Sequence, residues 1–270
     1  MADDVEDLNQ ILTLERIEVN LFRGVAPPDQ GARIYGGLVI SQALAAAYKT
    51  VEGRICHSLH CYFIRPGDPS VPILYDVDRA RDGKSFTTRR VTAIQHGAQI
   101  FNLAASFQTP ETGFEHQDPM PSSPKPETLT ETGTDWRRVI EMRWVDGRDM
   151  TTSQPSPPTQ NVWMRVLAPL SDDIATQQAA LAYASDMSLL GTCTRPHGVS
   201  WQTPGFQSAS LDHAIWFHRP SNFNDWHLYA QRSPSASGGR GLNFGDIYDV
   251  DGRLVASVVQ EGLIRMRGTG

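Results

Sequence analysis

The sequence predicts an α+β fold made of two similar halves, each with an antiparallel sheet wrapped around one long buried helix. Each half contains one nearly uninterrupted apolar segment of helical length, followed by several short segments rich in β-branched and aromatic residues. Short motifs also recur in the same order in the two halves. With 270 residues, the chain is long enough for two domains of ordinary size.

The recurrence consists of three pairs of motifs. RIEVNLFRG aligns with VIEMRWVDG, YFIRP with WFHRP, and QHGAQIF with VDGRLVA, at offsets of 123, 154 and 155 residues along the chain. The second copy therefore carries about thirty extra residues in its early part. Chance similarity between amphipathic strands is the alternative explanation, but the common order of the pairs favours duplication.

A proline-rich connection is expected between the two halves. Residues 110–134 contain many Ser, Thr and Glu together with five prolines, which are Pro110, Pro119, Pro121, Pro124 and Pro126. Such a composition is typical of an exposed, extended connection. We therefore expect an N-terminal domain over residues 1–112, a linker over 113–134 and a C-terminal domain over 135–270.

Two segments are predicted to be the central helices. YGGLVISQALAAAYKTV (35–51) is apolar nearly all round, which is typical of a buried helix. DDIATQQAALAYASDMSLLG (172–191) is the second, with Ser171 as the expected N-cap, Asp172 and Asp173 in the first turn, and Gly191 as the stop signal.

The strands of each half are predicted from alternating or β-rich segments that are separated by turns. In the first half these segments are CHSLHCYFI, VPILYDVDRA, SFTTRRVTAI and AQIFNLAASFQ. RDGKS, QHGAQ and, in the second half, DVDGRL contain glycine at places suited to hairpin turns. Strands joined by such short turns run antiparallel.

Composition excludes several classes of protein. The formal net charge is −6 and the isoelectric point about 5.7, so a basic surface for nucleic acid or for an anionic membrane is not expected. An odd number of cysteines (Cys56, Cys61 and Cys193) implies no disulfide framework and fits a reducing compartment. The chain has no apolar leader at its N-terminus, no run long enough to span a bilayer and no peroxisomal signal in its last residues, RMRGTG. We expect a cytoplasmic protein without membrane insertion.

CHSLHC (56–61) offers cysteine and histidine side chains and raises the question of a zinc site. On a regular strand the side chains alternate between faces. The alternation groups Cys56, Ser58 and His60 on one face and His57, Leu59 and Cys61 on the other. The four possible ligands are then split, so no metal is expected here.

Three well-known motifs are missing or incomplete. Gly83-Lys84-Ser85 lacks the glycine that a phosphate-binding loop has five residues earlier, where this chain has Asp78. The sequence also lacks the G-x-S-x-G turn of α/β-hydrolases and the G-x-G-x-x-G fingerprint of dinucleotide-binding proteins.

Asp186 is an informative polar residue because it lies late in the second predicted helix, on its apolar face. A carboxylate near a helix C-terminus is opposed by the helix dipole, and burial adds a further free-energy cost. One interpretation is a buried aspartate that ties the helix to the sheet through hydrogen bonds. The other is a catalytic acid or base whose pKa is raised. The residues alone leave both open.

SASLDHAIWFHRP (208–220) brings serine, aspartate and histidine together and suggests a hydrolase triad. If the stretch is a strand, Asp212 and His213 point to opposite faces and cannot form a side-by-side relay. The same alternation places Ser210 on the face of Asp212. Ser210, and Gln260 in the last strand ASVVQEGLIR, are on this reasoning ordinary polar residues of a sheet.

The chain resembles the acyl-CoA thioesterase II family, the double-hotdog thioesterases. The resemblance spans about residues 14–267 and rests on YGGLVISQAL, HSLHCYFIRPGD, YDVDRARDGKSFTTRRV, FNLAASFQTPETGFEHQ, RWVDGRD, SDMSLLG, SLDHAIWFHRP and VQEGLIR. It implies two hotdog folds in tandem and hydrolysis of acyl-CoA thioesters without a cofactor. Mapped by motif, it also implies a catalytic set of Asp186, Ser210 and Gln260, which orient and activate water. The start of the first helix, Gly36-Gly37, is the expected source of backbone N–H donors for the oxyanion.

Further expectations follow from the resemblance. The partner is an acyl-CoA substrate, and the chain is expected to form homo-oligomers, a dimer or a tetramer. The alternative function is a non-catalytic acyl-CoA binding or regulatory protein on the same fold, which a degraded catalytic set would favour. A hydratase is a third possibility and needs an aspartate and a histidine that converge. The sequence does not reveal the acyl length, the residues that bind the coenzyme A phosphates, or the role of Asp212 and His213.

Overall fold

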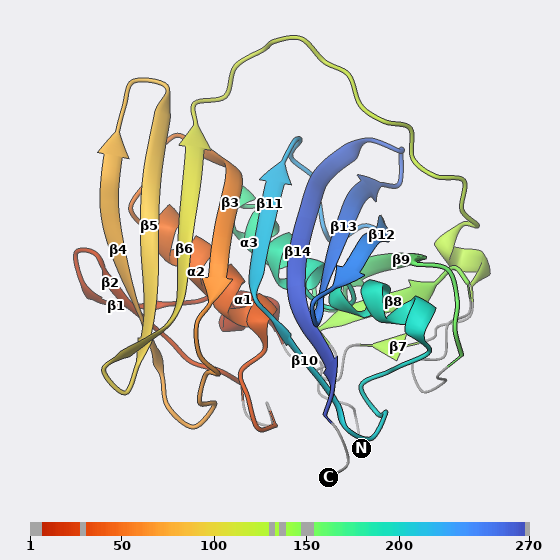
Figure 1. The fold of residues 1–270 in the computed structure, drawn as a ribbon. Coiled ribbons are helices and arrows are strands. Elements are labelled where there is room, and N and C mark those ends of the chain that lie inside the picture. The colour runs from red at the N-terminus through yellow and green to blue at the C-terminus, as the bar shows by residue number, and fades with distance from the viewer. Residues whose placement is uncertain (1–6, 28–30, 130–132, 135–138, 147–153, 268–270) are drawn as a thin grey trace, which may run out of the picture.

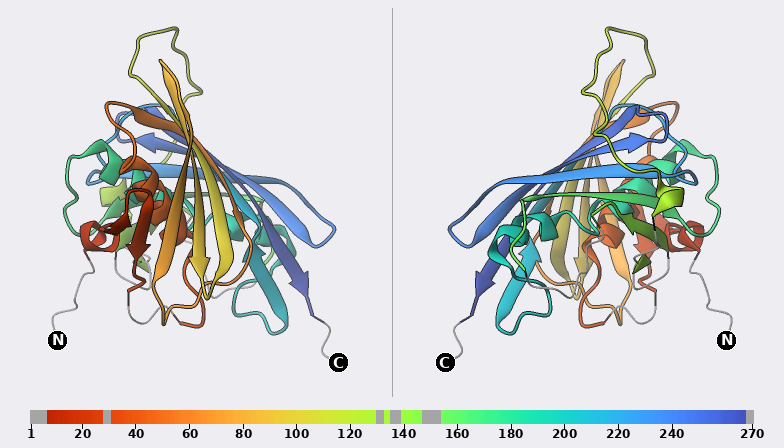
Figure 2. Two further views of the ribbon diagram at one scale, coloured as in Figure 1. Left: turned by 90° about the vertical axis from the view of Figure 1, so that its left-hand side faces the viewer. Right: turned by 90° about the vertical axis from the view of Figure 1, so that its right-hand side faces the viewer.

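The computed structural model describes residues 7–27, 31–129, 133–134, 139–146 and 154–267. Strands of these residues form one continuous antiparallel sheet of fourteen strands, and the long helices lie together behind it (Figure 1). The sheet is strongly twisted and curves around the helices, which gather on one side of it (Figure 2). This is the predicted α+β architecture, a tandem hotdog.

The elements of the first half occupy the N-terminal part of the chain. They are α1 (Leu8–Ile11), β1 (Glu15–Glu18), β2 (Leu21–Gly24), α2 (Gly36–Tyr48), β3 (Ile55–Phe63), β4 (Ile73–Asp82), β5 (Phe86–Gln95) and β6 (Ala98–Gln108).

The elements of the second half follow a connection that contains the short 3₁₀ helix η1 (Pro126–Thr128). They are β7 (Gly133–Thr134), β8 (Ile140–Trp144), β9 (Thr159–Val166), α3 (Ile174–Ser185), the 3₁₀ segment η2 (Leu190–His197), β10 (Phe206–Ser210), β11 (Asp212–Phe217), β12 (His227–Ser237), β13 (Arg240–Asp249) and β14 (Leu254–Met266).

The order of the strands in the sheet agrees with the predicted repeat. From the central pair β3–β11 outward, one side runs β6, β5, β4, β2, β1 and the other β14, β13, β12, β9, β8, with β7 at that edge. The offset of 154 places His60 on Ala214, and these two residues are paired directly across β3 and β11. The internal twofold axis therefore passes through the middle of the sheet. Gly147, the last residue of the motif VIEMRWVDG, lies outside the described residues.

Helix α2 is buried as expected, and it packs against α3. The predicted ends of α3 were wrong. Its N-cap is Asp173 rather than Ser171, because the Asp173 carboxylate accepts the N–H of Thr176 at 3.0 Å. The helix ends at Ser185 with Asp186 as its C-cap, and Gly191 lies in η2.

The predicted face assignment in CHSLHC was wrong at its first residue. A β-bulge between Cys56 and Ser58 shifts the alternation in β3. Cys56 consequently joins Leu59 and Cys61 in the hydrophobic core, whereas His60 is exposed. Periodicity could not reveal this, because a bulge inserts one residue without a clear sequence signal.

The connection between the halves runs outside the sheet from β6 toward η1 (Figure 1). Residues 109–125 form no helix or strand. Gln117 fastens this segment to the turn before β14: its amide nitrogen donates to Gly252 O at 2.8 Å, and its amide oxygen accepts the N–H of Leu254 at 3.1 Å. The three domain boundaries given above stay predictions.

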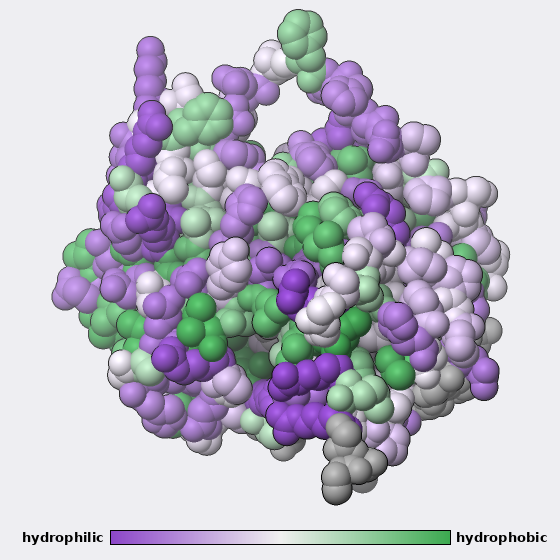
Figure 3. All heavy atoms as spheres, in the orientation of Figure 1, coloured by the Kyte–Doolittle hydropathy of each residue, from purple (hydrophilic) through white to green (hydrophobic). Residues whose placement is uncertain are grey.

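Among the described residues, no helix is both long and apolar enough to cross a membrane. The outer face of the sheet carries polar and apolar side chains side by side (Figure 3).

Arg89 on β5 is a buried link between the C-terminal end of α2 and the sheet. Only 1% of the residue is exposed. Its guanidinium donates to Thr50 Oγ1 at 2.8 Å, to Thr50 O at 3.0 Å and to Arg81 O at 3.1 Å, and it pairs with Asp82 at 2.6 Å. These bonds satisfy carbonyl groups where α2 meets the sheet.

The substitution Arg89→Met is expected to lower the free energy of unfolding by about 2–4 kcal/mol, because it leaves buried carbonyl groups without donors. Urea unfolding measures the change. Arg90→Met is the matched control, since Arg90 is the exposed neighbour on the same strand. Equal stability of the two variants would contradict this role of Arg89.

Candidate active site

Asp186 lies where the C-terminal end of α3 meets the N-terminal end of α2. Its side chain is only 6% exposed, and the backbone N–H of Gly37 acts to lower the pKa of its carboxyl group. A Cβ atom at Gly36 would lie 2.7 Å from Asp186 Oδ2, and one at Gly37 would lie 2.4 Å from Tyr183 O. Glycine at both positions therefore lets the start of one helix approach the carboxylate at the end of the other.

The two other residues of the predicted set meet Asp186. Gln260 comes from β14 and Ser210 from the end of β10, which pairs with β14. The Gln260 amide nitrogen donates to Asp186 Oδ1 at 2.6 Å and to Ser210 Oγ at 2.9 Å. One amide group therefore joins a carboxylate and a hydroxyl that are far apart in the sequence.

The predicted alternation through SASLDHAIWFHRP was wrong at Leu211. The strand is interrupted there, between β10 and β11. Asp212 and His213 do face apart, as expected: His213 is buried, whereas Asp212 accepts the N–H of Glu261 at 2.7 Å. Because of the interruption, however, Ser210 meets the Gln260 amide that bonds to Asp186 instead of sharing a face with Asp212.

His213 is the site residue that the sequence did not reveal. It is 1% exposed, and its Nδ1 lies 3.9 Å from Asp186 Oδ1, which is too long for a hydrogen bond. Its Nε2 lies 2.9 Å from Ser185 Oγ. The sequence excluded the adjacent Asp212 as its partner and suggested no other, and the fold brings it close to Asp186.

The geometry around Ser185 favours one tautomer of His213. Ser185 Oγ donates to Ala182 O at 2.9 Å, which uses its single proton. Nε2 of His213 is then the donor to Ser185, and Nδ1 carries the free lone pair. Within the described parts of the chain, His213 Nδ1 and Gln260 Oε1 are buried acceptors without a hydrogen-bond donor. The site therefore has unused acceptor capacity close to Asp186.

The electrostatics of the site follow from burial. Burial raises the pKa of Asp186 to about 7, although the hydrogen bonds from Gln260 and Gly37 act in the opposite direction. Burial also lowers the pKa of His213 to about 3, so the imidazole is neutral at physiological pH. The site thus pairs a neutral histidine with a carboxyl group poised between its two protonation states.

A pocket of about 340 Å³ adjoins these residues. It is lined mainly by apolar groups and by Ser210 and Gly36, and the exposed Arg33 and Arg65 also line it. Sequence reasoning did not single out these two arginines, since nothing in their local pattern distinguishes them from other surface arginines. No grouping of three or more metal-ligating side chains occurs among the residues that the structure describes.

Fold and site together define a class: a tandem hotdog enzyme with a buried carboxylate, an amide and a hydroxyl at the end of its helix pair. Comparison with known proteins identifies the family. The acyl-CoA thioesterase model matches residues 138–263, and the acyl-CoA thioesterase N-terminal domain model matches residues 26–108.

Individual relatives agree with the family models. Acyl-CoA thioesterase 2 of Haemophilus influenzae is 40% identical over 98% of this chain and 99% of its own length. The crystal structure of acyl-CoA thioesterase II TesB2 from Mycobacterium marinum matches with a TM-score of 0.85 and 43% identity, over 98% of this chain and 100% of that one. A hotdog-fold protein from Alicyclobacillus acidocaldarius matches with a TM-score of 0.83 at 18% identity, over 97% and 98% of the two chains, which supports the fold alone. The chain belongs to the acyl-CoA thioesterase family and is a thioester hydrolase.

The raised pKa of Asp186 predicts a specific pH dependence of stability. The folded-state pKa of about 7 lies above the reference value of 3.8, so the stabilising contribution is fully present below pH 3.8 and is lost as pH rises through 7. Relative to Asp186→Asn, the wild-type protein is expected to lose roughly 4 kcal/mol of unfolding free energy across this window. Urea unfolding at a series of pH values measures the difference, and a constant difference would contradict the raised pKa.

Proposed function

We propose that this protein hydrolyses fatty acyl-CoA to free fatty acid and coenzyme A, with water activated by Asp186 in a set with Ser210 and Gln260. The observation that carries the proposal is the convergence of these three side chains at the N-terminal end of α2, beside the pocket of about 340 Å³. The names of the relatives supply the substrate class, and the position of the hydrogen-bonded set supplies the mechanism.

In this mechanism Asp186 is the general base. Water attacks the thioester carbonyl carbon while the Asp186 carboxylate takes one of its protons, and Ser210 and Gln260 hold the water in place. The carbon–sulfur bond of the tetrahedral intermediate then breaks, and Asp186 returns the proton to the departing coenzyme A sulfur. A pKa of about 7 suits both steps near neutral pH.

The oxyanion is stabilised by the N-terminal end of α2. This helix has no side-chain N-cap, so its first amide groups face the site without a competing internal acceptor. Because the N–H of Gly37 acts on the Asp186 carboxyl group, the N–H of Gly36 is the better candidate for the carbonyl oxygen. The aspartate thereby also fixes the orientation of the helix end that serves the oxyanion.

The exposed arginines of the pocket, Arg33 and Arg65, are the candidates for binding the phosphates of coenzyme A.

We propose that the enzyme acts in the cytoplasm, because its composition is acidic and its cysteines form no disulfide among the described residues. We also propose a homo-oligomer, a dimer or a tetramer, because Tyr62 (58% exposed) and Trp216 (36% exposed) lie at the centre of the sheet's outer face.

The alternatives are less well supported. A non-catalytic binding protein is not favoured, because the catalytic set is complete and the relatives are named thioesterases. One observation supports hydratase activity: His213 lies close to Asp186, which the sequence did not predict. Release of free thiol from a panel of acyl-CoA esters, compared with hydration of crotonyl-CoA, separates the two reactions.

The substitution Asp186→Asn is expected to reduce kcat about 10²- to 10⁴-fold, because it removes the base without removing its volume. In the wild-type protein, the rate is expected to rise with pH through a midpoint near 7, as Asp186 ionises. Thiol release from acyl-CoA measures both. Asp212→Asn is the matched control and retains activity, since its amide oxygen can still accept the N–H of Glu261. Full activity of Asp186→Asn would refute the mechanism.

His213 is expected to add to the effect of burial on the pH midpoint through the lone pair on Nδ1, which faces Asp186 and disfavours the carboxylate. His213→Gln keeps a donor toward Ser185 but removes this lone pair, so the midpoint moves to lower pH by about one unit. His213→Asn keeps an amide oxygen at the place of Nδ1, and its midpoint stays near 7. The pH dependence of kcat tests the pair, and identical profiles for the two variants would show that His213 is only structural.

A further inference from the structure

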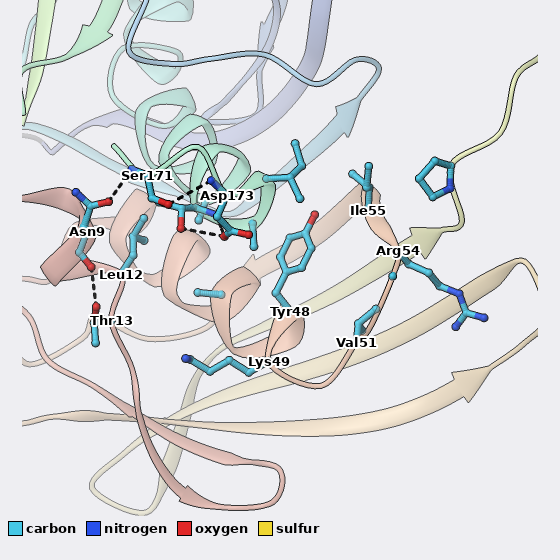
Figure 4. A pocket seen from close by; sticks show the side chains of 17 residues that line it. Asn9, Leu12, Thr13, Tyr48, Lys49, Val51, Arg54, Ile55, Ser171 and Asp173 are labelled. Atoms are coloured by element: carbon cyan, nitrogen blue, oxygen red, sulfur yellow. Dashed lines mark hydrogen bonds between the residues drawn. The ribbon is translucent and has the colours of Figure 1, made fainter. Parts of the chain in front are cut away.

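A second and larger pocket lies at the opposite end of the helix pair. Its volume is about 780 Å³, within the range of ligand-binding sites. The C-terminal end of α2 and the first turn of α3 form it, together with α1 and the start of β3 (Figure 4). Its apolar lining includes Leu12, Ala45, Val51, Ile55, Ile174 and Ala179.

The internal repeat makes this pocket the counterpart of the candidate active site. The active site joins the end of α3 to the start of α2, whereas the second pocket joins the end of α2 to the start of α3. The strand interruption also recurs: the offset of 154 places Leu211, between β10 and β11, on His57, where β3 has its bulge. The two sites are therefore the same place in the two halves.

Each catalytic position has a different residue in the second pocket. Asp186 is the C-cap of α3, and the C-cap of α2 is Lys49. The offset of 154 places Ser210 on Cys56, and the offset of 155 places Gln260 on Ala105. A cation thus replaces the acid, and neither remaining position can orient water as the amide and hydroxyl do.

Three further features argue against hydrolysis at this place. The start of α3 is capped by its own Asp173 carboxylate, which accepts from Thr176 N, whereas the start of α2 has no side-chain cap. The polar groups at the inner end of the pocket already bond to one another. The Tyr48 hydroxyl accepts the N–H of Cys56 at 2.8 Å and donates to the side-chain oxygen of Gln178. Burial also raises the pKa of the Cys56 thiol, so it supplies no nucleophile.

We propose that the second pocket is a non-hydrolytic site for a free fatty acid, with the acyl chain on the apolar lining and the carboxylate near Lys49. Lys49 is exposed, lines the pocket, and forms no salt bridge with any residue that the structure describes. Arg54 adds a second positive charge at the edge, where its guanidinium donates to neutral groups, among them Gly83 O at 2.6 Å, and also acts on the Asp82 carboxylate. The Asp173 carboxylate, the acidic group in the lining, is engaged as the cap of α3.

The choice of ligand rests on the proposed function, because a fatty acid is the product of that reaction. Lysine at the C-cap of α2 carries a positive charge where α3 ends in an aspartate. The second pocket therefore favours an anionic headgroup, whereas the candidate active site takes a neutral thioester. Product released at one end of the helix pair would then be held at the other.

Isothermal titration of the full chain carrying Asp186→Asn with sodium dodecanoate tests the proposal without any dependence on hydrolysis. Lys49→Glu is expected to weaken binding at this site by about fivefold, the size of one partly exposed ion pair. Ala175→Trp fills the pocket from the first turn of α3 and is expected to remove one bound dodecanoate per chain. Lys125→Glu, on the exposed connection, is the matched charge control and leaves binding unchanged.

Ligand chemistry gives a second comparison. Dodecyltrimethylammonium has an alkyl chain of similar length with a positive headgroup, and it is expected to bind more weakly than dodecanoate. In Lys49→Glu the preference for dodecanoate over this cation is expected to be smaller. Dodecanoate binding that neither Lys49→Glu nor Ala175→Trp alters would overturn the proposal. Absence of thiol release from acyl-CoA by the wild-type protein would overturn the proposed function instead, so the two failures are distinguishable.

Discussion

The contact on which the site depends is the close approach of the start of α2 to the carboxylate that ends α3. The carboxylate of Asp186 lies against the positive N-terminal end of the α2 dipole. This offsets its unfavourable position at the negative C-terminal end of the α3 dipole. Gly36 and Gly37 make the approach possible, and the packing of α2 on α3 maintains it. Burial of this junction raises the pKa of Asp186, and the contact with the start of α2 acts in the opposite direction.

Much of this arrangement could be predicted from the sequence. The apolar helices, the hairpin turns and the repeat follow from periodicity and glycine placement, and motif resemblance located Asp186, Ser210 and Gln260. The failures share a physical cause. Strand interruptions at His57 and Leu211 shift the faces of their neighbours, and His213 became part of the site only through contact with a residue in another element. A local pattern cannot show a bulge or a tertiary neighbour.

The two halves have kept one fold and diverged in chemistry. The strand order is the same from the centre outward on both sides, yet α3 ends in an aspartate that faces a helix without a side-chain cap, whereas α2 ends in a lysine that faces a capped helix. Changes at only a few positions separate these two ends, because the backbone already supplies the cavity and the helix termini.

The two halves of the molecule do not depend on the external connection to stay associated. It crosses outside the sheet and is fastened by Gln117, while the β3–β11 ladder and the packing of α2 on α3 hold the halves together. Cleavage of a peptide bond in this segment would leave two polypeptides that remain associated through a complete sheet. The same molecule could thus be encoded as two separate genes, whose products assemble into a heterodimer with one asymmetric pair of sites.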